Sequence, residues 1–247
     1  MNKQHQPQII GIIPARGGSK SVPYKNIKPL AGIPLLVYML KAALGSKFLT
    51  RVLVSSEDKK ILAVARKYGG PKTVLARPKR LALDSTPSLP VIKHAVKKIE
   101  SREGSFFDYI VMLQPTTPLV TSRDIDAALH KLIRTKADTV VSVYQVNDSH
   151  PVKMKKIVKD RLVPYFPGIK EVVFRRQDLD PVYKRNGGIY ASKREVVMRQ
   201  GLLYGGRITR PYVMPSERSV DVNSHVDFLV LEAIVRQNST KKRLVQK

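Results

Sequence analysis

The chain of 247 residues contains no cysteine and no tryptophan, and it has few acidic residues. Without cysteine it cannot form disulfides, thiolate zinc sites or iron–sulfur clusters, and it has no cysteine nucleophile. This composition suits a reducing compartment, and we expect a cytoplasmic protein. Long hydrophobic runs are also missing. The apolar stretch at residues 9–13 is far too short for a signal peptide or a membrane span, so no membrane association is expected.

Positive charge is in large excess, because 45 Lys and Arg face 19 Asp and Glu, which gives a formal net charge of +26. Such a charge is typical of nucleic-acid-binding proteins, but it also attracts small anionic substrates. Lysine-rich surfaces occur on ordinary proteins as well. Aromatic residues make up only 6%, and we find neither base-stacking clusters nor a nucleic-acid-binding motif. Nucleic-acid binding is therefore the less favoured alternative.

Strand-like and helix-like segments alternate between residues 8 and 145. The expected strands are residues 8–14, 51–55, 73–76, 109–113 and 139–143. The expected helices are residues 33–44, 58–68, 87–99 and 123–134, the last with Ser122 as its N-cap. This alternation predicts an α/β fold with a doubly wound, mostly parallel sheet. Ligands of such sheets bind at the carboxyl ends of the strands, which points to the loops at residues 14–26, 55–58, 76–87 and 114–121.

The pattern changes between about residues 147 and 185, where proline recurs and no long helix is expected. We interpret this stretch as a small β subdomain inserted into a single domain of residues 1–247, used as an arm or partner contact. The α/β pattern then resumes. We expect strands at residues 188–191 and 210–214 and helices at residues 193–200 and 224–237.

Two of the predicted carboxyl-edge loops carry residues suited to nucleotide binding. Residues 14–20 read PARGGSK, in which two glycines let backbone amides approach a phosphate while Arg16 and Lys20 supply positive charge. Residues 114–118 read QPTTP and follow the most apolar strand, where amide and hydroxyl groups suit a base or a sugar. A tight structural turn is the simpler interpretation of either motif.

Two further segments suit anions or a metal. Residues 175–178 (RRQD) and 184–188 (KRNGG) are basic clusters that suit a carboxylate or triphosphate, unless they are solvated loops. Residues 219–223 read SVDVN, and in a strand Asp221 and Asn223 share a face, where their oxygens are able to hold Mg²⁺. Alternatively, Asn223 caps the next helix. The five histidines lie far apart and show no metal-ligand spacing.

Six segments, taken together and in order, resemble the N-acylneuraminate cytidylyltransferase (CMP-sialic acid synthetase) family. They read IIPARGGSKSVPYKNIKPLAGIPL, VLARPKRLALDST, VMLQPTTPL, HPVKMKKI, RRQDLDPVYKRNGGIY and PSERSVDVNSHVDF, and span roughly residues 9–230. The resemblance implies a nucleotide-diphospho-sugar transferase-like fold with an inserted dimerisation segment, and a homodimer. It also implies that CTP and Mg²⁺ activate a sialic-type nine-carbon sugar acid, giving the CMP-sugar and pyrophosphate.

The resemblance further implies roles for individual residues. Those implied to bind the nucleotide are Ala15, Arg16, Gly17, Gly18, Ser19, Lys20, Asn26, Arg77 and Ser88. Those implied to bind the sugar acid are Gln114, Lys153, Arg176, Lys184 and Asn186. Those implied to be catalytic are Arg16, Lys25 and Asp221, and Mg²⁺ is expected at Asp221 and Asn223.

The main departure from the family pattern is Asn223, which stands where the family usually carries the second Asp of Asp-x-Asp. An amide oxygen can still bind a metal, but an amide cannot act as a general base. Either Asp221 with Mg²⁺ suffices, or another group takes the proton, or activity is low. A catalytically impaired relative that only binds nucleotide or sugar is therefore the second alternative. Lys184 stands where the family more often has Arg, and the sequence does not select among the nine-carbon acids.

Overall fold

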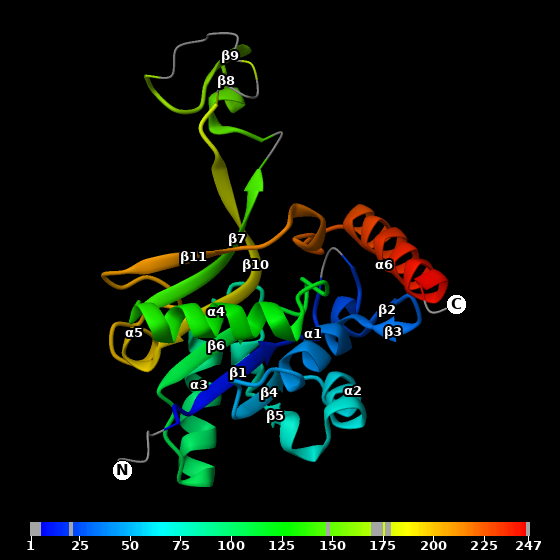
Figure 1. Ribbon diagram of the computed structural model, residues 1–247, viewed down its shortest axis with the longest axis vertical. Helices are drawn as coiled ribbons and strands as arrows, with labels where there is room; N and C mark the ends of the chain where they lie inside the picture. Colours follow the sequence, from blue (N-terminus) through cyan, green and yellow to red (C-terminus); the bar gives the residue numbers. More distant parts are fainter. Residues whose placement is uncertain (1–5, 20–21, 147–148, 169–174, 176–178, 246–247) are drawn as a thin grey trace.

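The computed structural model describes residues 6–19, 22–146, 149–168, 175 and 179–245, with side chains up to residue 238. Its main body is a seven-stranded sheet in the order β11-β7-β10-β6-β1-β4-β5 (Figure 1). The strands are β1 (Ile9–Pro14), β4 (Arg51–Ser56), β5 (Val74–Ala76), β6 (Tyr109–Leu113), β7 (Thr139–Val146), β10 (Val182–Lys193) and β11 (Thr209–Val213). Only β10 runs antiparallel to its neighbours, so the predicted α/β fold with a mostly parallel sheet is confirmed.

Helices cover both faces of this sheet. They are α1 (Leu35–Leu44), α2 (Lys59–Gly69), α3 (Ser88–Glu103), α4 (Ser122–Thr135), α5 (Arg194–Met198) and α6 (His225–Val245). Side chains of α1, α2 and α4 pack on one face, and those of α3 and α5 pack on the other. Among the described residues, no helix is long and apolar enough to cross a membrane.

The interior strand β1, between β6 and β4, shows why the apolar runs form buried strands. Ile9 and Ile13 belong to the core on one face, whereas Ile10 and Ile12 belong to the core on the other. Successive side chains of a strand point to opposite faces, so a strand covered on both faces must be apolar throughout. This burial brings the glycine-rich loop to the carboxyl edge of the sheet.

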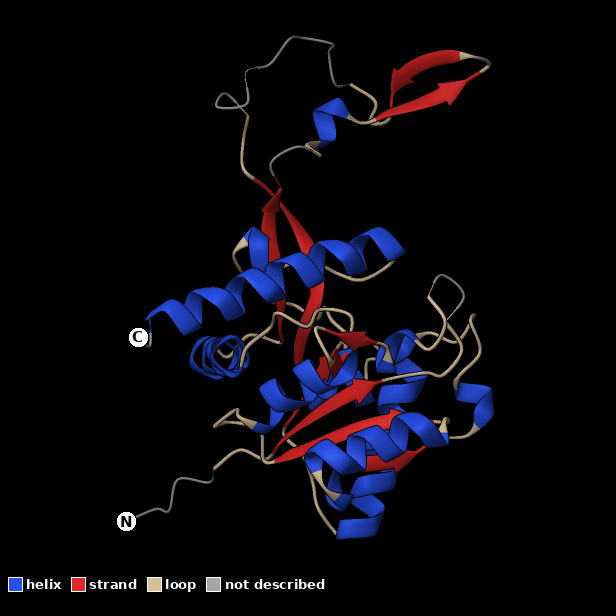
Figure 2. Cartoon of the chain, turned by 90° about the vertical axis from the view of Figure 1, so that its right-hand side faces the viewer, coloured by secondary structure: helices blue, strands red, loops and turns tan. Residues whose placement is uncertain are grey.

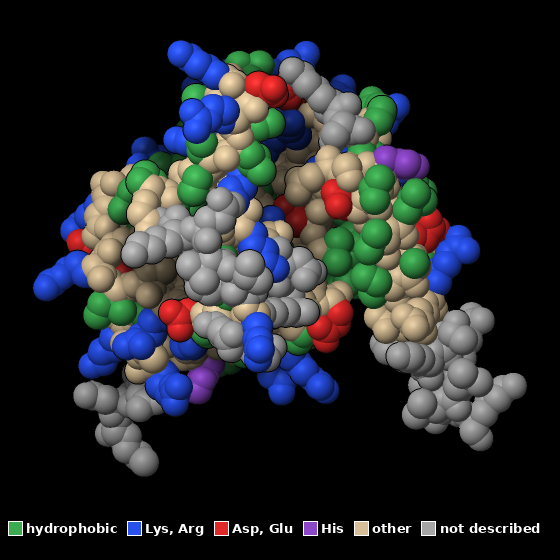
Figure 3. All heavy atoms as spheres, turned by 90° about the horizontal axis from the view of Figure 1, so that it is seen from above, with side chains coloured by type: hydrophobic (Ala, Val, Ile, Leu, Met, Phe, Trp, Pro, Cys, Tyr) green, Lys and Arg blue, Asp and Glu red, His purple; other side chains and the backbone are tan. Residues whose placement is uncertain are grey.

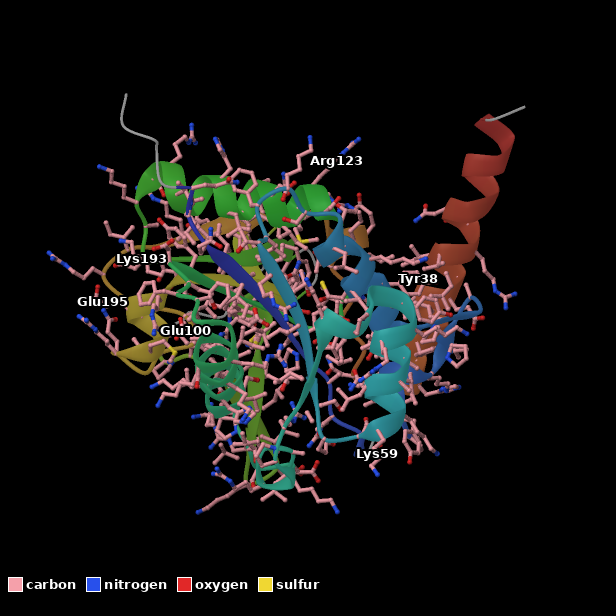
Figure 4. All side chains as sticks on the ribbon, turned by 90° about the horizontal axis from the view of Figure 1, so that it is seen from below. Tyr38, Lys59, Glu100, Arg123, Lys193 and Glu195 are labelled. Atoms are coloured by element: carbon pink, nitrogen blue, oxygen red, sulfur yellow. The ribbon has the colours of Figure 1, made fainter. Side chains whose placement is uncertain are left out.

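The C-terminal helix α6 packs against the start of the chain. Phe228 and Leu231 of α6 join Leu30 in a small core that also contains Val222. Leu30 belongs to a two-strand ribbon of β2 (Pro29–Leu30) and β3 (Ile33–Pro34). Tyr38 of α1 lies toward α6, as Figure 4 shows, and its hydroxyl donates to the carbonyl of Leu30 at 2.7 Å.

An arm projects from the main body between β7 and β10. It carries the hairpin of β8 (Lys155–Val158) and β9 (Arg161–Pro164), whose place at the far end of the arm is clear in Figure 2. Lys159 and Asp160 form the hairpin turn with φ of 48° and 60°, the left-handed conformation that a two-residue type I′ turn requires. Exposed apolar side chains of the arm are Met154, Ile157, Val158, Leu162, Tyr165 and Phe166.

Short 3₁₀ segments connect several of these elements. They are η1 (Lys25–Ile27), η2 (Pro71–Thr73), η3 (Lys79–Leu81), η4 (Pro151–Lys153) and η6 (Ser216–Arg218). Two of them, η1 and η3, lie in loops at the carboxyl edge of the sheet, and η4 lies at the base of the arm hairpin.

Several element boundaries differ from the sequence-based expectation. The predicted N-cap Ser122 is wrong, because Thr121 caps α4: its hydroxyl accepts from the amide of Asp124 at 3.3 Å, and the Asp124 carboxylate accepts from the Thr121 amide at 2.8 Å. The predicted strand at residues 188–191 is only part of the 12-residue β10, whose first half continues into the arm. The last helix runs to Val245 rather than to residue 237.

Candidate active site

A polar cavity of about 390 Å³ lies at the carboxyl end of the parallel strands. Its walls come from the loops after β1, β5 and β6 and from the segment before α6. Three of the four loops that the sequence pointed to therefore form walls of this cavity. The predicted site residues that line it are Arg16, Ser19, Lys25, Asn26, Arg77, Ser88, Gln114, Asp221 and Asn223.

The glycine-rich loop after β1 is held in shape by its own residues. Arg16 forms an ion pair with Asp84, which lines the cavity from the loop after β5. The buried Asn26 donates from its side-chain amide to the carbonyl oxygen of Arg16 at 2.9 Å. Gly17 has no room for a side chain, because a Cβ there would lie 2.6 Å from Oδ2 of Asp58. The need for glycine at this position is therefore steric.

Glu57 joins this loop to Arg77, a role that sequence analysis missed. One carboxylate oxygen of Glu57 accepts from the amide of Gly17 at 2.7 Å, and the other lies 2.9 Å from the Arg77 guanidinium. The Arg77 side chain is only 3% exposed. Burial lowers the pKa of Arg77, and the charge of Glu57 opposes that shift. The available signal was a carboxylate directly after the buried strand β4, inside a loop already expected to bind ligand.

Lys25 links the glycine-rich loop to the segment before α6. Its Nζ donates to the carbonyl oxygen of Val222 at 2.7 Å. Partial burial lowers the pKa of Lys25, the nearby Asp221 carboxylate opposes this shift, and Arg16 adds to it. Lys25 thus lies near both Arg16 and the Asp221 carboxylate, and all three groups line the same cavity.

Asp221 and Asn223 contact each other, although residues 219–223 do not form a strand. Nδ2 of Asn223 donates to Oδ2 of Asp221 at 3.0 Å. The alternative that Asn223 caps the next helix is wrong, because the hydroxyl of Ser224 accepts from the amide of Asp227 at 3.2 Å and the Asp227 carboxylate accepts from the Ser224 amide at 2.7 Å.

Gln114 lines the cavity at the end of β6, beside a glycine of β10. Gly187 has a φ of +81°, and a Cβ there would lie 2.6 Å from Oε1 of Gln114 and 3.8 Å from Oδ2 of Asp221. The positive φ favours glycine at this position, and a larger residue would also displace the end of the Gln114 side chain. The bulged part of β10 thus passes close to Gln114 and Asp221.

Other predicted site residues lie outside the cavity wall. Ala15 is fully buried, and the backbone of Gly17 and Gly18 is not part of the wall. Lys153 and Lys184 are exposed on η4 and on the arm half of β10. Lys20 and Arg176 lie outside the described residues.

Asn186 is buried, and its side chain is bonded within the fold. Its Oδ1 accepts from the Ser142 hydroxyl at 2.6 Å and from the amide of Gly188 at 3.0 Å. Its Nδ2 contacts the Met214 sulfur and the Ser219 hydroxyl, each at 3.1 Å. These contacts connect β10 to β7 and to the segment that leads to Asp221.

The oxygen donors at the cavity fit a hard divalent cation. Oδ1 of Asp221 is buried and has no hydrogen-bond partner within the described part of the chain. The described residues contain no group of three or more His, Asp or Glu side chains suited to a metal. Mg²⁺ is commonly bound through one or two carboxylates together with substrate phosphates and water, so a single Asp221 is compatible with it.

Comparisons with known proteins show the family of the chain. Residues 10–213 match the model of the cytidylyltransferase family. The chain is 30% identical to the CMP-N,N'-diacetyllegionaminic acid synthase of Legionella pneumophila, over 94% of this chain and 97% of that protein. It is 34% identical to N-acylneuraminate cytidylyltransferase A of Danio rerio, over 91% of this chain but only 50% of that longer protein.

A solved structure supports the fold. The structure of CMP:2-keto-3-deoxy-manno-octonic acid synthetase complexed with CTP superposes with a TM-score of 0.70, at 18% identity, over 94% of this chain and 99% of that chain. Because the family match covers most of the chain and includes the loops after β1, β5 and β6, the chain belongs to the cytidylyltransferase family.

Proposed function

We propose that this protein transfers the CMP group of CTP to a sialic-type nine-carbon sugar acid and releases pyrophosphate. The observation that carries this proposal is the meeting of Arg16, Lys25 and Asp221 at one cavity on the carboxyl edge of the sheet. The relatives named for legionaminic and neuraminic acids support the substrate class. Other relatives are named for pseudaminic acid, so the class is broader than one sugar.

In the proposed reaction, the anomeric hydroxyl oxygen of the acid forms a bond to the α-phosphorus of CTP. The bond from that phosphorus to its bridging oxygen breaks, pyrophosphate leaves, and the hydroxyl proton passes to water. Positioning and neutralisation of charge account for most of the catalysis in such transfers. Arg16 and Lys25 offset the negative charge that develops on the α-phosphate and on pyrophosphate. Arg77, held by Glu57, shapes the nucleotide side of the cavity.

Mg²⁺ is proposed to bind at Asp221. Bound there, it supplies Lewis-acid polarisation of phosphate oxygens and lowers the pKa of the attacking hydroxyl. The chain's own contribution is to hold Asp221 at the cavity wall. The buried Val222 and the hydrogen bond from Lys25 both fix the backbone beside it.

We also propose a cytoplasmic homodimer in which the arm of one protomer approaches the sugar-acid site of the other. Lys153 and Lys184 are exposed on the arm rather than at the cavity of their own chain, which suits a role in a partner's site. Ile157 and Leu162 of the arm hairpin are 76% and 69% exposed, and a partner surface is the usual reason for such exposure.

Nucleic-acid binding receives little support from the face of the molecule that carries the arm. Figure 3 shows Lys and Arg side chains scattered around the face of the molecule rather than gathered in one stripe. A nucleic-acid-binding surface needs a continuous basic patch or stripe. The charge excess is therefore compatible with attraction of anionic substrates.

The test is a pyrophosphate-release screen of CTP and other nucleoside triphosphates against a panel of neuraminic, legionaminic and pseudaminic acids. We expect release with CTP and at least one of these acids, and only with a divalent cation present. CTP binding without release for any acid would favour the impaired relative. Duplex binding that weakens steeply with salt, without CTP turnover, would favour the nucleic-acid alternative.

A further inference from the structure

Asp221 and Asn223 form a directional pair at the cavity. The carboxylate of Asp221 is an acceptor, so the group of Asn223 that lies 3.0 Å from it is the NH₂ group. This contact determines which way round the Asn223 amide lies. The carbonyl oxygen of Asn223, its one metal-binding atom, is not the atom that faces Asp221.

The backbone around the pair is fixed by other groups. Val222 is fully buried beside Phe228. Its amide donates to the carbonyl oxygen of Thr116 at 2.9 Å, and its own carbonyl oxygen accepts from Lys25. Because the main chain is clamped on both sides of this residue, the remaining freedom of Asp221 is rotation of its carboxylate.

The hydrogen bond to Asn223 restrains that rotation. It occupies Oδ2 of Asp221 and leaves Oδ1, the buried atom that has no hydrogen-bond partner in the described chain. Among the hydrogen bonds of the described residues, the bond to Asp221 is the single one that the Asn223 side chain makes. The helix cap, the other use for an Asn at this position, is supplied by Ser224 and Asp227.

We propose that Asn223 is a positioning residue that acts through Asp221, and that this site holds its divalent cation with one carboxylate rather than two. The amide of Asn223 fixes one oxygen of Asp221, so that the other is free for the cation. A neutral donor does this without the repulsion that a second carboxylate at the same distance brings to the cation-free site. This inference rests on the metal-dependent transfer proposed above.

A double-mutant cycle separates a positioning role from a ligand role. Binding of Mn²⁺ in the presence of CTP is measured by electron paramagnetic resonance for Asp221→Ala, Asn223→Ala and the double variant. We expect Asn223→Ala to weaken Mn²⁺ binding by about 10-fold or more, as loss of an outer-sphere partner does. With Asp221 already removed, Asn223→Ala should have no further effect.

Three outcomes of this cycle would overturn the proposal. They are a second, equal loss of affinity in the double variant, an unchanged affinity in Asn223→Ala, and a lack of Mn²⁺ binding by the wild-type protein. The first is the result for two independent ligands. Asp160→Asn, which removes a carboxylate from the exposed hairpin turn, is the control and should bind Mn²⁺ as the wild type does.

A second measurement tests the contact without metal or turnover. Asn223→Asp turns the donor into a second carboxylate facing Asp221, and Asn238→Asp adds the same charge to an exposed position of α6. Without divalent cations, we expect Asn223→Asp to melt about 2–4 °C below Asn238→Asp, and Mn²⁺ to close the gap. Equal melting temperatures would show that the two side chains are not in contact.

These results are distinguishable from a failure of the proposed function. If the wild type releases no pyrophosphate with any acid but the Mn²⁺ cycle is non-additive, the proposed reaction fails and the positioning role stands. If pyrophosphate release is normal but the cycle is additive, the reaction stands and the positioning role fails.

Discussion

Glu57 holds the buried guanidinium of Arg77 with one carboxylate oxygen and the amide of Gly17 with the other. The distances are 2.9 Å to the guanidinium and 2.7 Å to the amide. The same guanidinium also donates to the carbonyl oxygen of Ser55 at 3.2 Å. Three loops that follow β1, β4 and β5 are thereby tied together beside the cavity. Removal of one partner leaves a buried charge uncompensated, which is costly.

Substitution Glu57→Gln keeps an acceptor for Gly17 but removes the charge that balances Arg77. We expect kcat/KM for CTP to fall by about 10- to 100-fold. Without the charge of Glu57 the loops shift, and a displacement of about 1 Å at a positioning group costs up to about 100-fold in rate. Steady-state kinetics with CTP as the varied substrate are the measurement. Glu103→Gln is the matched control, because it breaks the ion pairs of Glu103 with Arg51 and Arg102 elsewhere on the molecule. Wild-type kinetics in Glu57→Gln would contradict the prediction.

Substitution Arg16→Ala removes a cation that lines the cavity and pairs with Asp84. We expect turnover to fall by about 10²- to 10³-fold, the usual cost of losing one donor to developing negative charge. Pyrophosphate release at saturating CTP checks this, with the exposed Arg134→Ala of α4 as control. Full CTP-dependent release by Arg16→Ala would show that the loop is wrongly assigned to the triphosphate.

Asp124 makes the protein's stability depend on pH. Burial disfavours its charge, but hydrogen bonds from Arg218, Thr121 and Tyr212 outweigh burial and lower its pKa below the ordinary value of 3.8. A depressed pKa stabilises the folded state above pH 4, and this contribution is lost as the pH falls through the folded-state pKa. We expect Asp124→Asn to lower the free energy of unfolding at pH 7 by about 1.5–3 kcal/mol.

Urea unfolding at a series of pH values measures this effect. The difference between wild type and Asp124→Asn should shrink as the pH falls below about 4, because the carboxyl of the unfolded chain takes up a proton there before that of the folded chain does. On the alkaline side, burial and Asp124 raise the pKa of Tyr212 to about 12. The folded state favours neutral Tyr212, so stability should fall between about pH 10 and 12 in the wild type and less in Tyr212→Phe. A constant difference at all acid pH values would contradict the role of Asp124.

Asn186→Ala separates a structural role from direct contact with the sugar acid. Its side chain bonds Ser142, Gly188, Met214 and Ser219. Loss of these contacts leaves buried polar groups unpaired, at about 1–3 kcal/mol for each group. We expect a lower free energy of unfolding, measured in urea, whereas the exposed Asn238→Ala should be neutral. A raised KM for the sugar acid with unchanged stability would instead support direct contact.

Much of the fold follows from local pattern. The run at residues 9–13 is apolar throughout, and it forms the interior strand β1, which is buried on both faces. Helix boundaries were less predictable. Thr121 and Ser122 are adjacent hydroxyl residues, and either could cap α4 by sequence. Thr121 is the cap because its amide donates to the Asp124 carboxylate. The length of β10 was also missed, because its first half is exposed and pairs with β7 outside the main core.

The candidate site was predictable to the level of loops and residue types. The strand order places the ends of β1 and β6 at the carboxyl edge of the sheet. Arg16 follows β1 and Gln114 follows β6, and both line the cavity together with Asp221, which precedes α6. Glu57 was missed although it directly follows the buried strand β4, because its place in a ligand-binding loop does not show which groups it contacts. Its partner Gly17 lies 40 residues away along the chain.

The sequence by itself determined the alternation of strands and helices, the loops in which ligand-binding groups gather, and the resemblance to cytidylyltransferases. The pairing of distant groups came from the three-dimensional fold: Arg16 pairs with Asp84 across 68 residues, and Lys25 donates to the carbonyl oxygen of Val222 across 197 residues. Local patterns depend on neighbours a few positions apart, whereas these contacts depend on the order of strands in the sheet and on the docking of α6. That docking buries Val222 and brings Asp221 and Asn223 to the cavity wall.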